Sequence, residues 1–185
     1  QFHYTLSAKY FDELRFDGLY VASIESQMQA GVSPLPARIR DLRNDEIISV
    51  AAAGAHRSAV RARFTPARWA QFHADNQYFL LSNSDQYFES IRRDHGFNAT
   101  PTWVAVASLA VADRVINEHT ASQLSLIDPL LMALALLLVW RCFGLTTMLW
   151  CTVLLGTSYA GRYYWIGGSL LRIDWLAAVM CAACA

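Results

Sequence analysis

The sequence predicts an all-α fold, a polytopic α-helical membrane protein that carries a helical extramembrane loop domain. The first observation is the distribution of charge along the 185 residues, which include 15 Lys and Arg and 15 Asp and Glu. Only five charged residues follow residue 125, namely Asp128, Arg141, Arg162, Arg172 and Asp174. The second observation is the placement of apolar residues. They make up 55% of the whole chain, and after residue 125 they are almost continuous. This pattern is typical of a water-facing domain joined to membrane spans.

The composition also excludes several classes of protein. The chain is too apolar for a disordered protein, and it lacks the repeats of collagen and coiled coils. A net charge of zero gives no support for nucleic-acid binding. The cysteines all lie in or beside the apolar segments, at Cys142, Cys151, Cys181 and Cys184, so a disulfide framework is not indicated. No pair of histidines has metal-ligand spacing, and we expect no zinc site.

The polar domain is expected to cover residues 1–100. Apolar residues recur at helical spacing from Lys9 to Ala30, which predicts one helix with Gly18 as a weak point and Gly31 as its stop. Residues 33–43 are expected to be irregular, because they hold two prolines followed by a charged stretch.

Further helix starts follow from capping residues. Residues 51–64 are expected to form a second helix, and Thr65-Pro66 predicts a third from Pro66 to about Leu81, because Thr can cap and Pro suits the first helical position. Ser84 is expected to cap a short helix that ends near Gly96. The same signature at Thr100-Pro101 predicts one more helix start.

Residues 101–119 are expected to form an interfacial or re-entrant helix, because their apolar run is too short for the roughly 20 residues of a membrane span. Transmembrane helices are expected at about 124–143, 145–160 and 174–185, the last of them truncated. The short last span and the absence of an initial Met predict that the sequence is a piece of a longer polytopic protein. The few basic residues in the short loops do not decide its orientation.

The densest cluster of ionisable groups in the sequence comprises Asp12, Glu13, Arg15 and Asp17. On one helix Glu13 and Asp17 would share a face, and two close carboxylates compete for ionisation, so one of them could serve as a general acid or base. The alternative interpretation is a solvated helix face with an ordinary ion pair.

The order of features resembles the membrane glycosyltransferases of the C-type superfamily, which use lipid-phosphate sugar donors. That family has an acidic motif near the start of its first long extracytoplasmic loop, either Asp-Glu or an Asp followed three residues later by Tyr. Asp12-Glu13 resembles the first form, and Asp17-Gly18-Leu19-Tyr20 resembles the second. The segment Phe97-Asn98-Ala99-Thr100-Pro101 is similar to the family's aromatic-Pro-Pro segment, although only one proline is present.

The resemblance implies a topology and a reaction. A first span would precede Gln1, and residues 1–125 would be extracytoplasmic, on the periplasmic side of a bacterial inner membrane. The enzyme would transfer a sugar from a polyprenyl-phosphate carrier to an acceptor, with Asp17 or Asp12 as the base. Asp17 is preferred because Gly18 and Tyr20 complete its motif, and Tyr20 would bind substrate. Glu13 would assist, or help to bind a divalent cation as a cofactor, although one carboxylate pair does not make a metal site.

A second candidate segment lies between the later spans, with the side chains Arg162, Tyr163, Tyr164, Trp165 and Arg172. The arginine fork matches a phosphate, and aromatic rings prefer the headgroup layer, so this segment could hold the phosphate of the lipid donor. The alternative is an aromatic belt with arginines that reach to the membrane surface.

A different functional class also fits the sequence. The chain could be a non-catalytic membrane subunit that docks onto the other subunits of a larger complex. The aromatic residues of its polar helices would then be interface anchors or, equally well, an ordinary core. These residues are Trp69, Phe72, Tyr78, Phe79, Tyr87 and Phe88.

Overall fold

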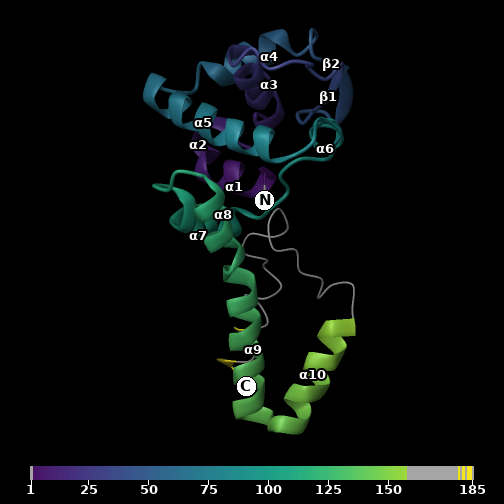
Figure 1. The fold of residues 1–185 in the computed structure, drawn as a ribbon, viewed down its shortest axis with the longest axis vertical. Coiled ribbons are helices and arrows are strands. Elements are labelled where there is room, and N and C mark those ends of the chain that lie inside the picture. The colour runs from purple at the N-terminus through teal and green to yellow at the C-terminus, as the bar shows by residue number, and fades with distance from the viewer. Residues whose placement is uncertain (1, 158–178, 180, 182, 185) are drawn as a thin grey trace. The chain divides into compact units, whose positions relative to one another are not determined.

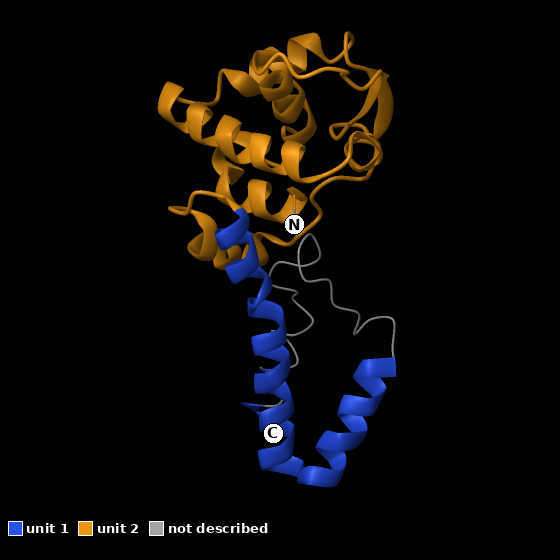
Figure 2. Cartoon of the chain, in the orientation of Figure 1, with its two compact units in different colours: residues 1, 118–185 blue, residues 2–117 orange. Residues whose placement is uncertain are grey.

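The computed structural model describes residues 2–157, 179, 181, 183 and 184, and these are mostly helical (Figure 1). The chain divides into two compact units (Figure 2). Phe2–Asn117 form the first, which we call the polar unit, and Glu118–Ala185 belong to the second, which we call the apolar unit. The helical part of the predicted fold class is therefore confirmed.

Three helices build the centre of the polar unit, α1 (Phe2–Lys9), α3 (Leu19–Gln29) and α5 (Pro66–Ser82). They pack against one another, and α4 (Gly54–Arg61) and α7 (Pro101–Val111) cover α3 and α1, respectively (Figure 1). The side chains of α3 are buried along most of its length, from Leu19 to Ile24 without interruption. The core of the polar unit therefore forms around α3.

The predicted single helix over residues 9–30 is wrong. The segment forms α1, the single turn α2 (Phe11–Leu14) and α3, and Arg15 in the break between α2 and α3 has a φ of 51°. Gly18 occupies this break because a side chain would not fit there. A Cβ atom on Gly18 would lie 2.6 Å from the Leu14 carbonyl oxygen and 2.9 Å from Cγ1 of Val60. Tertiary packing of α4 against the turn thus overrides the helical periodicity.

The predicted capping signals are confirmed. The hydroxyl of Thr65 accepts a hydrogen bond from the Arg68 backbone N–H, and Pro66 begins α5. Ser84 caps α6 (Asp85–Ile91), which is shorter than predicted, and Thr100 caps α7. These caps satisfy backbone donors that the first helical turn leaves without intrahelical partners.

The predicted irregular segment before residue 43 contains the first strand of a hairpin. β1 (Arg38–Asp41) pairs antiparallel with β2 (Glu46–Ser49), with Ile39 opposite Ile48. Ile39 is fully buried, and this strand contacts α3. The hairpin thus joins the core through a single apolar side chain, which explains why the charged sequence around it gave no strand signal.

The described part of the apolar unit consists of α8 (Glu118–Ser125), α9 (Ile127–Phe143) and α10 (Leu145–Thr157). The 26 residues of Glu118–Phe143 are the one stretch of described helix that is long and apolar enough to cross a membrane. Gly144, with a φ of 85°, makes the turn into α10, which contacts α9. Asp128 lies in the first turn of α9 and is buried. The predicted span over 174–185 falls almost entirely outside the described residues.

Candidate functional site

Asp17 lies in the turn between α2 and α3, where its carboxylate is partly exposed. Two terminal nitrogens of Arg63 donate to its two oxygens, each at 3.2 Å. The Nε2 atom of His56 lies 2.8 Å from Oδ2 of the same carboxylate. Partial burial alone would raise the pKa of Asp17, but the hydrogen bonds and charges of Arg63 and His56 outweigh burial and lower this pKa. Asp17 is therefore held ionised at neutral pH.

His56 supports Asp17 from inside the core. Its side chain is 4% exposed and lies between two carboxylates, since Nδ1 is 3.9 Å from Oδ1 of Asp41. That second distance is too long for a hydrogen bond. Asp41 is itself held by Arg43, whose Nε and Nη2 donate at 2.9 and 2.6 Å. These hydrogen bonds lower the pKa of Asp41 despite its burial. His56 thus lies between one partly exposed and one buried acidic group.

The other two acidic candidates have different surroundings. Glu13 is nearly buried, and Arg68 donates through Nε to its Oε1 at 2.8 Å. Asp12 is exposed on α2. The prediction that Glu13 and Asp17 share one helix face is wrong, because the break after Leu14 separates them. Their side chains are instead held by two different arginines, so they do not form a carboxylate pair.

Tyr20, the predicted substrate-binding tyrosine, is fully buried in α3. Its hydroxyl donates to the Asp94 carbonyl oxygen at 3.2 Å and lies 2.8 Å from Nε2 of His3. Burial, followed by the charge of Asp94, raises the pKa of this hydroxyl. The structure therefore places Tyr20 as a link between α3, α1 and the segment after α6, and its hydroxyl is occupied by these internal contacts.

Aromatic rings join the two segments on which the family resemblance rests. Phe16, directly before Asp17, stacks on Phe97 with ring centroids 5.9 Å apart and an interplanar angle of 17°. Phe11 also contacts Phe97, and Tyr4 donates from its hydroxyl to Oδ1 of Asn98 at 3.1 Å. Phe16 remains 45% exposed, whereas Phe97 is buried. A half-exposed aromatic ring thus lies next to the ionised carboxylate in the sequence.

The second candidate segment, Arg162, Tyr163, Tyr164, Trp165 and Arg172, lies outside the described residues. Within the described part of the chain, no three His, Cys, Asp or Glu side chains are placed to hold a metal ion together. Four of the six aromatic residues considered as docking anchors are buried in the polar unit, namely Trp69, Phe72, Phe79 and Phe88. Those four residues are part of its core, and among the six only Tyr87 is exposed.

Sequence reasoning missed the partners of Asp17. His56 and Arg63 are 39 and 46 residues away in the chain, so no local spacing connects them to the acidic motif. Neither His56 nor Arg63 belongs to a motif in the sequence. Only the packing of α4 on α3 brings them to the turn that carries Asp17.

Comparisons of this chain with protein-family models, with curated proteins and with solved structures found no match.

Proposed function

We propose that the chain is part of a membrane glycosyltransferase that moves a sugar from a polyprenyl-phosphate carrier to an extracytoplasmic acceptor. One observation carries this proposal. The acidic turn and the segment that begins at Phe97, which together motivated the resemblance, are in contact through Phe16, and an ionised and partly exposed carboxylate lies beside that contact. Asp17 is preferred over Asp12 as the catalytic base because its position is fixed by two cationic or hydrogen-bonding partners.

The proposed step is a single displacement with inversion. The acceptor hydroxyl oxygen forms a bond to C1 of the sugar while the bond from C1 to the phosphate oxygen breaks. The electron pair of the broken bond leaves with the polyprenyl phosphate, and the hydroxyl proton passes to the Asp17 carboxylate. A carboxylate has about four lone-pair sites. Oδ2 already accepts from both Arg63 and His56, whereas Oδ1 accepts from Arg63 alone, so Oδ1 has room for a hydroxyl donor.

The pKa of Asp17 fits a role in orientation as well as in proton transfer. A lowered pKa makes the carboxylate a weaker base but keeps its negative charge close to the reacting carbon, where positive charge develops. Phe16 adds a flat apolar surface on which the C–H face of a sugar ring can pack. These features together suit a substrate that is polar at its hydroxyls and apolar on one ring face.

The proposal includes a membrane location. The helix Glu118–Phe143 would be the first span after the polar unit, and α10 together with the residues that follow it would complete a polytopic arrangement. Residues 1–125 would face the periplasm of a bacterial inner membrane, where polyprenyl-phosphate sugars are displayed. Arg162 and Arg172 remain the proposed contacts for the phosphate of the lipid donor.

The test measures donor consumption by the protein as encoded, expressed in bacterial membranes. Membranes receive polyprenyl phosphates that carry radiolabelled glucose, mannose, galactose or an aminopentose, and released polyprenyl phosphate is quantified. Asp17→Asn should reduce release by a factor of about 100 or more, because removal of a catalytic base typically costs this much. Asp17→Glu should restore part of the activity.

Glu25→Gln is the matched control, because Glu25 is also a carboxylate of the α3 region paired with an arginine, Arg57 at 2.6 Å. It should leave activity unchanged. Thermal unfolding of each variant separates loss of catalysis from loss of folding. The proposal fails if none of the donors is consumed, or if a folded Asp17→Asn protein is as active as the unchanged protein.

A further inference from the structure

A buried arginine without a carboxylate partner marks a second site in the polar unit. Arg92, at the end of α6, is 1% exposed. Its Nη1 donates to Oε1 of Gln27 at 2.7 Å and its Nη2 to Oγ of Ser23 at 2.8 Å, both of them neutral acceptors. Nε has no hydrogen-bond partner, and the guanidinium makes no ion pair within the described part of the chain.

An uncompensated buried charge is costly, so a buried arginine usually has a carboxylate beside it. Burial lowers the pKa of Arg92 to about 10, which still leaves the side chain charged at neutral pH. Three of its five N–H groups are not used by Gln27 and Ser23. The site therefore has both the charge and the free donors to receive an anionic group.

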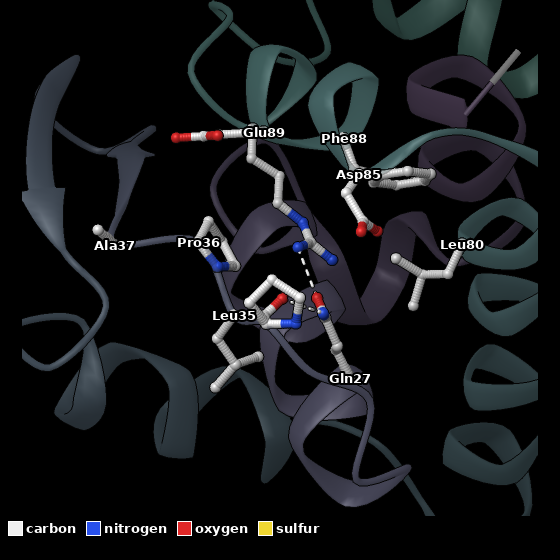
Figure 3. Close-up of a pocket in the computed structure, with 10 residues that line it drawn as sticks. Gln27, Leu35, Pro36, Ala37, Leu80, Asp85, Phe88 and Glu89 are labelled. Atoms are coloured by element: carbon white, nitrogen blue, oxygen red, sulfur yellow. Dashed lines mark hydrogen bonds between the residues drawn. The ribbon is translucent and has the colours of Figure 1, made fainter.

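Arg92 lines a cavity of about 200 Å³ between α3, α6 and the segment 34–37. Gln27 holds this segment in place, because its Nε2 donates to the Pro34 carbonyl oxygen at 3.1 Å while its Oε1 receives Arg92. Figure 3 shows Leu80, Phe88 and Pro36 around the same cavity as Gln27. The walls thus combine apolar side chains with polar ones, and the hydrogen bond from Arg92 to Gln27 fixes the position of the positive charge.

Two acidic residues also line the cavity, but they differ in their surroundings. Glu89 is paired with Arg93, and its carboxylate points away from Gln27 in Figure 3. Asp85 makes no ion pair within the described residues, and its carboxylate points toward the interior of the cavity (Figure 3). The cavity therefore presents one positive and one negative group, which disfavours a phosphate dianion and favours a ligand that carries both charges.

We propose that this cavity binds a small zwitterion of the amino-acid type, with its carboxylate on Arg92 and its ammonium group on Asp85. An arginine fork matches a carboxylate in geometry, and Leu80 and Phe88 would contact the apolar side chain of the ligand. The volume is below the roughly 300 Å³ at which pockets for drug-sized ligands begin, so a nucleotide or a glycolipid headgroup is too large. The site is separate from Asp17, since the rise of α3 from Leu19 to Gln27 is about 12 Å.

The experiment is equilibrium dialysis of the purified full chain in lipid nanodiscs with radiolabelled L-valine and glycine. Saturable binding is expected below about 10 mM, and inorganic phosphate should not compete. Leu35→Trp should abolish binding, because this exposed residue of the segment 34–37 can fill the cavity without disturbing the core. Asp85→Asn should weaken binding by about tenfold, the equivalent of one lost ion pair.

Arg57→Gln is the control, because Arg57 already has a carboxylate partner in Glu25 and lies on α4. It should bind both amino acids as the unchanged chain does. Arg92→Gln should also lose binding. Because this change also disturbs the core, the variants at Leu35 and Asp85 are the ones that test the proposed site. The proposal is overturned if neither amino acid binds, if both variants bind normally, or if phosphate displaces the bound amino acid.

Discussion

His56 lies with its Nε2 atom 2.8 Å from the Asp17 carboxylate, although 39 residues separate them in the sequence. Asp17 is at the surface end of this contact, and the imidazole is almost completely buried. Because Arg63 holds the same carboxylate, the position of Asp17 depends on α4 and the turn after it as much as on its own turn. A change in the α4 region should therefore reach the proposed active site directly.

Asp17 should make the polar unit sensitive to acid. Its pKa in the folded chain lies below the value of about 3.9 for an unfolded aspartate, so the folded state binds protons less readily than the unfolded state. The stabilisation is complete above about pH 5 and is lost as pH falls through the unfolded and then the folded pKa. Urea unfolding followed by tryptophan fluorescence should show a smaller loss of stability below pH 5 in Asp17→Asn than in the unchanged chain.

Asp41 also has a lowered pKa, so part of the acid sensitivity should survive in Asp17→Asn. Asp41→Asn in the same background should remove a further part. Equal acid sensitivity in all three proteins would contradict the assignment of these ion pairs as sources of stability.

Gly18 should tolerate no side chain. Alanine at this position would bring its Cβ atom within 2.6 Å of the Leu14 carbonyl oxygen, a backbone atom that cannot move aside easily. Gly18→Ala should lower the free energy of unfolding by about 1–3 kcal/mol, as overpacking does in other cores. Gly54→Ala is the matched control, because nothing lies within 4 Å of its Cβ position at the start of α4. It should raise stability by about 0.5 kcal/mol, and the reverse order of the two variants would refute the packing argument.

Helix starts were the part of the fold that sequence predicted best. Thr65, Ser84 and Thr100 act through atoms within three residues, so their signals are complete in the local sequence. The break at Gly18 depends on Val60, and strand β1 depends on the burial of Ile39 against α3. These causes lie in tertiary contacts, and periodicity within one segment could not reveal them.

In the candidate site, too, the local features could be predicted from the sequence and the tertiary contacts could not. Asp17 could be selected from its local motif, because Gly18 and Tyr20 follow it in the sequence. The partners that fix its charge, His56 and Arg63, come from another helix and the turn after it. Nothing in the sequence indicated that Arg92 is buried, since an arginine beside a second arginine in a polar helix ordinarily faces water. Its burial is visible only once α6 is packed on α3.

The buried ion pair between Lys9 and Asp75 should make a large contribution to the stability of the polar unit. Nζ of Lys9 lies 2.6 Å from Oδ2 of Asp75, and both side chains are almost completely buried. The same carboxylate accepts from the Tyr10 hydroxyl at 2.6 Å and from the Ile116 backbone N–H at 3.0 Å. Asp75→Leu should lower the free energy of unfolding by about 3–5 kcal/mol, because it leaves the Lys9 charge buried and unpaired.

A double-mutant cycle tests this interpretation. Lys9→Met alone should also destabilise the chain, whereas Lys9→Met with Asp75→Leu should cost less than the sum of the two single changes, because no charge is then left buried. Chemical unfolding of all four proteins gives the coupling energy. Strict additivity would mean that the two charges do not stabilise each other.

The exposed face of α7 should contact lipid. This helix buries Trp103, Val104 and Val111 in the polar unit, but Leu109 is 86% exposed. Only residues 112–117 separate α7 from the candidate span in the sequence, so under the proposed membrane location this helix could reach the lipid surface. An exposed leucine on such a helix gains free energy when it enters the interface, because its apolar surface leaves water.

The measurement is electron paramagnetic resonance of a nitroxide attached at Leu109→Cys in nanodiscs, after the native cysteines are replaced by serine. Oxygen, which concentrates in lipid, should relax this label more strongly than a water-soluble nickel complex does. Leu81→Cys is the matched control, since Leu81 is 81% exposed but lies at the end of α5. Its label should respond mainly to nickel, and the same response at Leu109 would place α7 in water and contradict an interfacial helix.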